Sequence, residues 1–184
     1  MAKDLKSRGI TGLNYSLVSQ AMNDGFTAKT GSLTPEQCQK IVYNHLSSLN
    51  KKKYEGGIAE GNKFLEDNKG KEGIITLPSG LQYQVLTPAT GDKPKATDEV
   101  TVHYKGTLMN GKQFDSSYDR NEPATFPLNG VIPGWTEGVQ LMPVGSKYKF
   151  FIPYQLGYGA NGAGQDIPPY SVLIFEIELI KIGK

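Results

Sequence analysis

The sequence has little of the side-chain chemistry on which most catalytic mechanisms depend. It contains 1 cysteine and 2 histidines among 184 residues. Cys38 has no second cysteine with which to form an internal disulfide or a metal-binding cluster. No spacing joins His45 and His103 to a Ser/His/Asp triad or to a set of metal ligands. Each histidine is therefore more simply a surface residue or one with its own hydrogen-bond partner.

Long apolar runs and a surplus of one charge are also missing. The net charge is +2, and the densest basic cluster is Lys51, Lys52 and Lys53. Nucleic acid and anionic membranes need a dense basic patch, so neither is expected as a partner. The run "VLIF" at 172–175 is far shorter than the ~20 apolar residues that cross a bilayer. The opening "MAKDLKSRG" lacks the apolar core of a secretory signal, which leaves a cytosolic chain or an exported chain whose signal has been removed.

The composition changes near residue 72. Residues 1–72 hold 11 basic and 8 acidic residues and 1 of the 11 prolines. Residues 73–184 hold 9 basic and 10 acidic residues and the other 10 prolines. This difference predicts two domains of different construction, 1–72 and 73–184.

The first domain is predicted to contain a long connecting helix. Thr34 suits the N-cap, Pro35 suits the first helical position, and Gln37 completes a capping box. The apolar spacing of three and four extends this helix over about residues 35–68, a length of roughly 50 Å. Its apolar stripe consists of Cys38, Ile41, Val42, His45 or Leu46, and Leu49.

Glycines and a short partner helix complicate this first domain. Gly56, Gly57 and Gly61 each cost roughly 1 kcal/mol relative to alanine in a helix, so we expect weakness or a bend there. Upstream, "NYSLVSQAMNDGF" is typical of a shorter helix capped by Asn14. So short a segment cannot bury both apolar stripes by itself. A second copy of the chain is the simplest cover, which predicts a homodimer through the N-terminal helices.

From residue 80 the apolar period changes to two. The segments "EVTVHYKG", "SKYKFFIP" and "SVLIFEIELI" alternate in the manner of antiparallel strands with one buried face. In "PGWTEGVQLM", Trp135 and Val139 are four residues apart, which indicates a short helix against that face. "LGYGANGAGQDIPPYS" must be a loop, because its glycines and prolines break both regular elements.

A set of aromatic and aliphatic residues is predicted to face inward. Spacing alone favours an ordinary core of a small β domain over a pocket for this set. Its members are Tyr104, Phe114, Phe126, Val131, Ile132, Trp135, Tyr158 and Phe175.

Four motifs resemble one enzyme family. "VTVHYKGTLMNGKQFDSS", "VIPGWTEGVQLMPVGSK", "LGYGANGAG" and "IPPYSVLIFEIEL", in this order, are similar to the FKBP-type peptidyl-prolyl cis/trans isomerases. The resemblance covers about residues 80–182. The N-terminal part, through its long helix and the junction "LPSGLQY", resembles the bacterial macrophage infectivity potentiator group, whose members dimerise through helical N-terminal domains. The resemblance implies an α+β fold: a C-terminal antiparallel β-sheet half-barrel wrapped on a short helix, preceded by an all-helical dimerisation domain.

The resemblance also implies the site residues. Its pocket positions match Tyr104, Phe114, Asp115, Ile132 with its backbone N–H, Trp135, Tyr158 and Phe175, and its substrate contacts match Phe126, Val131 and Ile167. In such a fold Arg120 lies close to Asp115 and Tyr104, and we include it among the substrate-binding residues. Ala124, Ala163 and Asp166 depart from the family pattern, which affects substrate preference and the affinity for macrolides.

The expected activity needs no nucleophile, metal or cofactor. Rotation about an Xaa-Pro bond removes amide resonance over a barrier of ~18–20 kcal/mol, and the twisted amide is less dipolar than the planar one. An apolar pocket therefore binds the twisted state better than the planar state. Asp115 is then a charged hydrogen-bonding wall residue that orients Tyr104; the alternative is an ion pair with Arg120 that only closes a loop.

The partners implied by this activity are unfolded or proline-containing polypeptides and, as inhibitors, rapamycin-like macrolides. The leading hypothesis is a dimeric isomerase that also holds unfolded chains. A binding module without useful catalysis and a purely structural dimeriser are the alternatives. The resemblance favours the periplasm or cell envelope, with the signal removed, over the cytoplasm.

Overall fold

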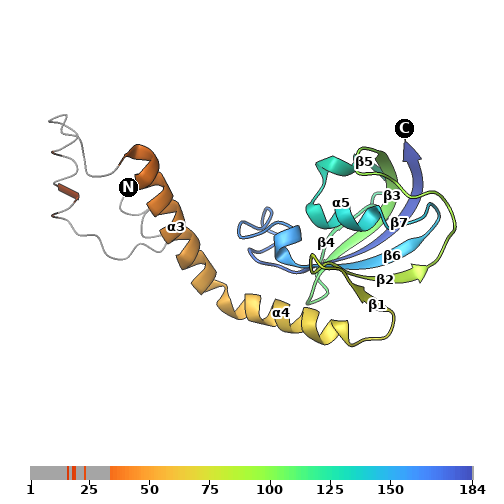
Figure 1. Ribbon diagram of the computed structural model, residues 1–184, viewed down its shortest axis with the longest axis horizontal. Coiled ribbons are helices and arrows are strands. Elements are labelled where there is room, and N and C mark those ends of the chain that lie inside the picture. Colours follow the sequence, from red (N-terminus) through yellow and green to blue (C-terminus); the bar gives the residue numbers. More distant parts are fainter. Residues whose placement is uncertain (1–15, 17, 20–22, 24–33, 184) are drawn as a thin grey trace. The chain divides into compact units, whose positions relative to one another are not determined.

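The computed structural model describes residues 16, 18, 19, 23 and 34–183 (Figure 1). The chain divides into two compact units, Met1–Lys53 and Tyr54–Lys184. In the first unit, helix α3 spans Pro35–Lys53. The shorter helix expected in "NYSLVSQAMNDGF" lies almost entirely outside the described residues, as do the side chains of Cys38, Val42 and Leu49 on which the apolar stripe of α3 depends.

The start signal of α3 forms as the sequence predicts. The Thr34 N–H donates to Oε1 of Gln37 over 2.8 Å, and the Gln37 N–H donates to Oγ1 of Thr34 over 3.2 Å. These reciprocal bonds satisfy two backbone donors that a helix start leaves without intrahelical acceptors. The capping box is thereby confirmed.

The helical segment expected over about residues 35–68 is divided at Tyr54. A second helix, α4, spans Glu55–Lys69 and belongs to the second compact unit. The division lies directly before Gly56 and Gly57, where the sequence predicted weakness. A Cβ at either glycine would meet no atom within 4 Å, so both lower helix stability without allowing a close contact.

The second unit is built on a curved antiparallel sheet. Its strands are β1 (Ile74–Thr76), β2 (Gln82–Thr87), β3 (Glu99–Leu108), β4 (Gln113–Ser116), β5 (Ala124–Pro127), β6 (Lys147–Ile152) and β7 (Leu173–Gly183). The order is β1-β2-β6-β7-β3-β4, and β5 pairs with the first part of β3. Figure 1 shows this sheet curving around the short helix α5, Pro133–Val139.

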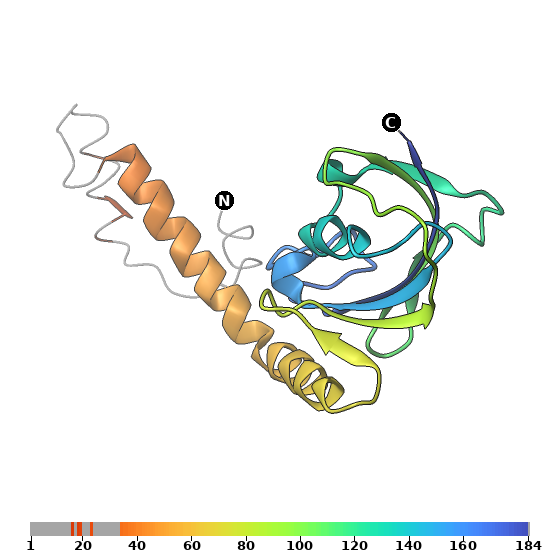
Figure 2. The ribbon, with the colours of Figure 1, turned by 45° about the vertical axis from the view of Figure 1, so that its right-hand side comes forward.

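The inner face of the sheet follows the predicted alternation. Phe150 and Ile152 of β6 are buried, as are Phe175 and Ile177 of β7. Helix α5 lies on this face, inside the curve of the strands (Figure 2). A Cβ at Gly138 would lie 2.6 Å from a ring carbon of Phe150, so glycine lets the helix approach the sheet closely. The half-barrel wrapped on a short helix is confirmed.

The outer face of the sheet, opposite α5, is partly buried beneath α4. The Phe64 ring lies 6.0 Å from the ring of Phe151, which is only 6% exposed. Asn68 donates to Oε1 of Gln82 over 2.9 Å, and Gln82 donates from Nε2 to the Leu65 carbonyl over 2.7 Å. Helix α4 is thus packed against the sheet. The division between the two compact units falls between residues 53 and 54 of the chain. The predicted boundary between domains 1–72 and 73–184 stays a prediction.

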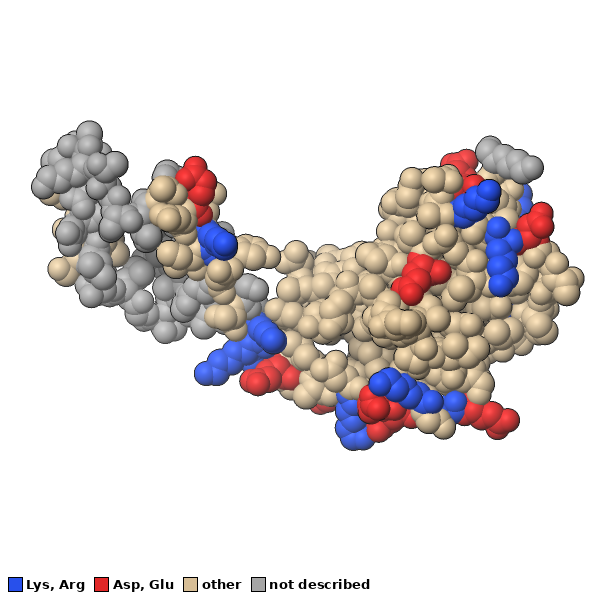
Figure 3. All heavy atoms as spheres, viewed as in Figure 1, with Lys and Arg blue, Asp and Glu red and all other residues tan. Residues whose placement is uncertain are grey.

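The surface carries charges of both signs. On the face seen in Figure 3, acidic and basic side chains are interspersed over the second unit. Among the residues that the structure describes, no helix has the length and apolarity of a membrane span.

Candidate active site

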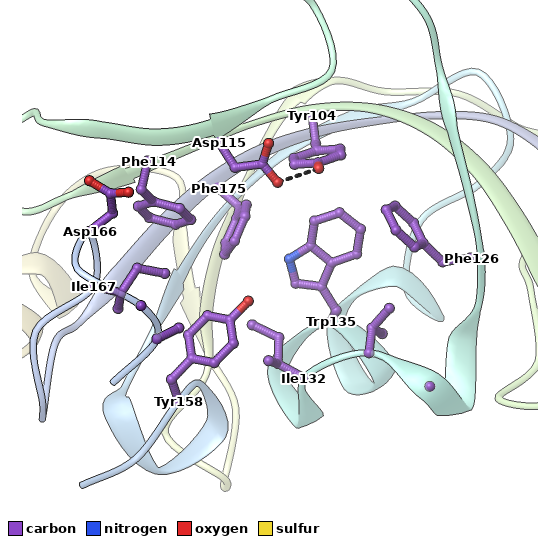
Figure 4. Close-up of a pocket in the computed structure, with 14 residues that line it drawn as sticks. Tyr104, Phe114, Asp115, Phe126, Ile132, Trp135, Tyr158, Asp166, Ile167 and Phe175 are labelled. Atoms are coloured by element: carbon purple, nitrogen blue, oxygen red, sulfur yellow. Dashed lines mark hydrogen bonds between the residues drawn. The ribbon is translucent and has the colours of Figure 1, made fainter. Parts of the chain in front are cut away.

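A cavity of about 570 Å³ opens between α5, the inner face of the sheet and the loop that joins β6 to β7 (Figure 4). Ten of the eleven residues that the sequence selected line it: Tyr104, Phe114, Asp115, Phe126, Val131, Ile132, Trp135, Tyr158, Ile167 and Phe175. Arg120 does not line the cavity but bonds to its wall. The lining also includes Gly130, Ala163, Gly164 and Asp166, which were not predicted as site residues. The last three lie in the glycine-rich β6–β7 loop, whose composition was the one signal in the sequence that could have indicated them.

The floor of the cavity is an edge-to-face aromatic cluster centred on Trp135. The indole meets Tyr104 at 5.2 Å and 82°, Phe126 at 5.8 Å and 89°, and Phe175 at 5.2 Å and 86°. Edge-to-face packing is a favourable arrangement for aromatic rings, so these contacts fix the indole plane. Among the described residues, Nε1 of Trp135 is the one buried side-chain nitrogen or oxygen without a hydrogen-bond partner, and Figure 4 shows it on the side of the ring toward Phe175 and Tyr158.

One glycine in the "HYKG" motif makes room for the cavity wall. A Cβ at Gly106 would lie 2.6 Å from the Phe114 ring and 2.7 Å from the Phe175 ring. The two rings meet edge to face at 5.4 Å and 84° over this position. Any larger residue at 106 would displace the two rings, because a rigid aromatic ring cannot avoid the clash by moving only its outermost atoms.

The polar part of the wall is a three-residue group. The Tyr104 hydroxyl donates to Oδ2 of Asp115 over 2.5 Å. Arg120 donates from Nη1 to Oδ1 of Asp115 over 2.6 Å and from Nη2 to the Tyr104 hydroxyl over 2.8 Å. Its guanidinium also lies 5.6 Å from the centre of the Tyr104 ring. The ion pair between Asp115 and Arg120 is therefore present, and it is shared with Tyr104.

These contacts set the ionisation of the wall. Burial raises the pKa of Asp115, but the hydrogen bonds from Tyr104 and Arg120 outweigh it, so the pKa lies below its usual value. Burial and the bond to Asp115 raise the pKa of Tyr104, and Arg120 offsets part of that rise. Burial and the negative charge of Asp115 raise the pKa of Tyr158. At neutral pH the carboxyl is ionised, and both hydroxyls keep their protons.

A serine behind the wall holds the backbone of Tyr104. Ser117, fully buried, accepts the Tyr104 N–H at Oγ over 2.8 Å and donates to the Tyr104 carbonyl over 3.2 Å. Nδ1 of His103 lies 2.9 Å from the same oxygen, and the imidazole stacks on Tyr118 at 4.7 Å. His103 is thus a histidine with its own partner, as predicted, whereas the role of Ser117 was missed although it stands in the "FDSS" motif. The His45 side chain lies outside the described part.

The remaining polar groups of the cavity lie at the start of α5, in the β6–β7 loop and at the cavity rim. The Ile132 N–H and the Tyr158 hydroxyl have no hydrogen-bond acceptor among the described residues. At the rim, Nζ of Lys112 lies 2.9 Å from Oδ1 of Asp166 in an exposed ion pair that joins the β3–β4 hairpin to the β6–β7 loop. No group of three or more His, Cys, Asp or Glu side chains suited to a metal occurs in the described part of the chain.

Comparison with known proteins assigns the chain to a family. A family model described as FKBP-type peptidyl-prolyl cis-trans isomerase matches residues 90–180, and one described as the domain amino terminal to FKBP-type peptidyl-prolyl isomerase matches residues 1–85. The FKBP-type peptidyl-prolyl cis-trans isomerase FkpA of Aeromonas hydrophila is 51% identical over 179 residues, which cover 94% of this chain and 66% of that protein. The crystal structure of FkpA from Escherichia coli is similar with a TM-score of 0.71 at 36% identity, covering 98% of this chain and 87% of that one. The chain belongs to the FKBP-type peptidyl-prolyl cis-trans isomerases.

This FKBP-type isomerase is also similar to the outer membrane protein MIP of Legionella longbeachae. The two are 42% identical over 191 residues, which cover 100% of this chain and 82% of the relative. The expected family, its macrophage infectivity potentiator subgroup, the fold class and the enzyme class are thereby confirmed. All the residues that line the cavity fall within the segment that the isomerase family model matches.

Proposed function

We propose that this isomerase binds the twisted Xaa-Pro amide in the cavity above Trp135. Rotation requires the amide to lose resonance over a barrier of ~18–20 kcal/mol, and the rotating amide is less dipolar than the planar one. Apolar, dewetted walls therefore stabilise the transition state more than the ground state. The observation that carries this proposal is the cluster of edge-to-face rings around Trp135, which offers the proline ring a flat and rigid apolar floor.

In this proposal the polar groups orient the substrate without transferring a proton. The Ile132 N–H and the Tyr158 hydroxyl are donors at the cavity without acceptors in the described chain, so they are suited to bind substrate carbonyls. Asp115 holds the Tyr104 ring in place, and its charge polarises the surroundings of the bound amide. Arg120 bonds to Asp115 and helps to lower its pKa, so we assign Arg120 a supporting position behind the wall.

The substrate class follows from the lining. Phe114, Phe126, Val131 and Ile167 surround the floor with apolar surface, which favours an apolar residue before proline. Unfolded or proline-containing polypeptides are the proposed substrates, and rapamycin-like macrolides are the proposed inhibitors because they are bulky and apolar. Asp166 and Ala163 lie in this lining, so we expect them to set macrolide affinity.

We further propose that the chain is a homodimer through its N-terminal helices and holds unfolded clients in the cell envelope. The side chain of Ile41 in α3 is 53% exposed, and the N-terminal family model covers this helix. A dimer presents two pockets, and two weak sites on one client raise the apparent affinity without any new contact. The name of the Legionella relative supports the envelope as location.

Catalysis is tested with Leu-Pro and Phe-Pro peptides in a protease-coupled assay. Asp115→Ala should lower kcat/KM about tenfold, equivalent to about 1.4 kcal/mol. The matched control is Asp67→Ala, since Asp67 is an ion-paired acid on α4 outside the cavity. Circular dichroism checks that each variant is folded. A folded wild-type chain that accelerates neither peptide, while still binding them, would make the domain a binding module and refute the catalytic proposal.

A further inference from the structure

Tyr158 is held from both sides by two other tyrosines of its loop. The Gly157 and Gly159 N–H groups donate to the Tyr154 carbonyl over 3.1 Å and 2.9 Å. The Tyr170 N–H donates to the Gly159 carbonyl over 2.9 Å. The backbone on both sides of Tyr158 is therefore bonded to the backbone of Tyr154 or Tyr170.

Tyr154 and Tyr170 also pack against each other. Their rings meet edge to face at 5.2 Å and 75°, and Tyr170 is 6% exposed. Tyr170 has a φ of 62°, in the left-handed region that is unfavourable for a residue other than glycine. A bulky residue stays in that conformation only where surrounding contacts hold it. The packing of the Tyr170 side chain therefore fixes the loop.

Helix α4 supplies part of that packing. Tyr54, immediately before α4, places its ring 6.0 Å from the Tyr170 ring at 44°. Further along the helix, a Cβ at Gly61 would lie 3.0 Å from a methyl of Val172, and Phe64 contacts Phe151. The helix is therefore attached to the loop at its start and to the sheet along its length.

We propose that Tyr54, Tyr154 and Tyr170 form an aromatic brace through which α4 positions Tyr158 for substrate. The proposal rests on the pocket role that the proposed function gives to Tyr158. Tyr54 and Tyr170 do not line the cavity, so they are positioning residues. A Tyr158 hydroxyl held in place binds the peptide equally in its ground and transition states. Loss of the brace therefore raises KM and leaves kcat unchanged.

The brace is tested in the full chain with a Leu-Pro peptide over a range of concentrations. Tyr54→Ala should raise KM about threefold to tenfold, in proportion to one lost aromatic contact, with kcat within about twofold. Tyr54→Phe keeps the ring and should restore the wild-type KM. Tyr43→Ala, which removes a 73% exposed tyrosine of α3, is the matched control and should change neither constant. If Tyr54→Ala does not fold, Tyr54→Leu takes its place, and the same outcomes decide.

A Tyr158→Ala background separates the brace from the proposed function. If the brace acts through Tyr158, Tyr54→Ala raises KM in the wild-type background and has no further effect in the Tyr158→Ala background. An equal effect in both backgrounds, or no effect in the wild-type background while Tyr158→Ala itself raises KM, overturns the brace alone. If Tyr158→Ala leaves KM and kcat unchanged, the pocket role of Tyr158 fails, and the brace fails with it.

Discussion

Replacing Asn68 by alanine tests whether α4 is a structural part of the isomerase unit. Asn68 and Gln82 are each 1% exposed, and Nδ2 of Asn68 is the donor to Oε1 of Gln82. In Asn68→Ala that buried oxygen loses its donor, while Nε2 of Gln82 keeps the Leu65 carbonyl. An unsatisfied buried polar group costs about 1–3 kcal/mol, so the free energy of unfolding should fall by this amount.

The assay is equilibrium unfolding in urea, followed by the fluorescence of Trp135, the single tryptophan of the sequence. Because Trp135 lies in the core of the isomerase unit, its signal reports the unfolding of that unit. Asn62→Ala makes the same chemical change at an exposed position of the same helix. It is therefore the control for the higher helix propensity of alanine, which affects both variants.

Asn62→Ala should lie within about 0.5 kcal/mol of the wild type. If Asn68→Ala is equally mild, Gln82 is satisfied without α4, and the helix is not docked as described. A double-mutant cycle with Gln82→Ala isolates the pair, and its coupling energy should lie at about 0.5–3 kcal/mol.

Two further predictions concern pH and client size. The pKa of Asp115 lies below its usual value and those of Tyr104 and Tyr158 lie above theirs, so kcat/KM should stay constant from about pH 5 to about pH 9. A slope in kcat/KM near pH 7 would contradict this ionisation. The stability that Asp115 contributes to the folded state is fully present above its unfolded-state pKa, and it is lost as pH falls through the lower folded-state pKa. The fragment Tyr54–Lys184, which keeps α4, should be a monomer by sedimentation and match the full chain on tetrapeptides, yet be slower in refolding a protein limited by proline isomerisation. Equal refolding rates would exclude a client-holding role for residues 1–53.

The inner face of the sheet was predictable because each long strand is amphipathic by itself. Tyr148, Phe150 and Ile152 alternate with lysines and Phe151, and burial of one face follows from a period of two. The burial of Gln82 was not predictable in this way. A glutamine in an alternating strand predicts a solvent-exposed position. Gln82 can be buried because its side chain bonds to Asn68 and to the Leu65 carbonyl. Such partners come from another element, so no local period contains them.

The cavity could be predicted only from the resemblance of the motifs to the family. Trp135 and Val139 have the spacing of one helix face, and both are buried, but only Trp135 lines the cavity. Spacing predicts which side of a helix is buried. A cavity forms where the side chains of neighbouring elements leave a space unfilled, and spacing within one element does not show this. That property belongs to several elements at once, here β3, β4, β5, α5, the β6–β7 loop and β7.

The hydrogen bonds of the Tyr104 group determine which atoms are left for the substrate. The Tyr104 hydroxyl has one proton, and it is already donated to Asp115, while Arg120 donates to its oxygen. Tyr104 therefore offers the cavity its ring rather than a hydrogen-bond donor, and its hydroxyl is bound within the wall. A charged group at the wall is thus compatible with an apolar floor, because Asp115 and Arg120 satisfy each other and Tyr104. In the proposed function, the donors to a peptide carbonyl are therefore the Ile132 N–H and the Tyr158 hydroxyl. Of these two, Tyr158 stands in the β6–β7 loop, so its position depends on the contacts of that loop.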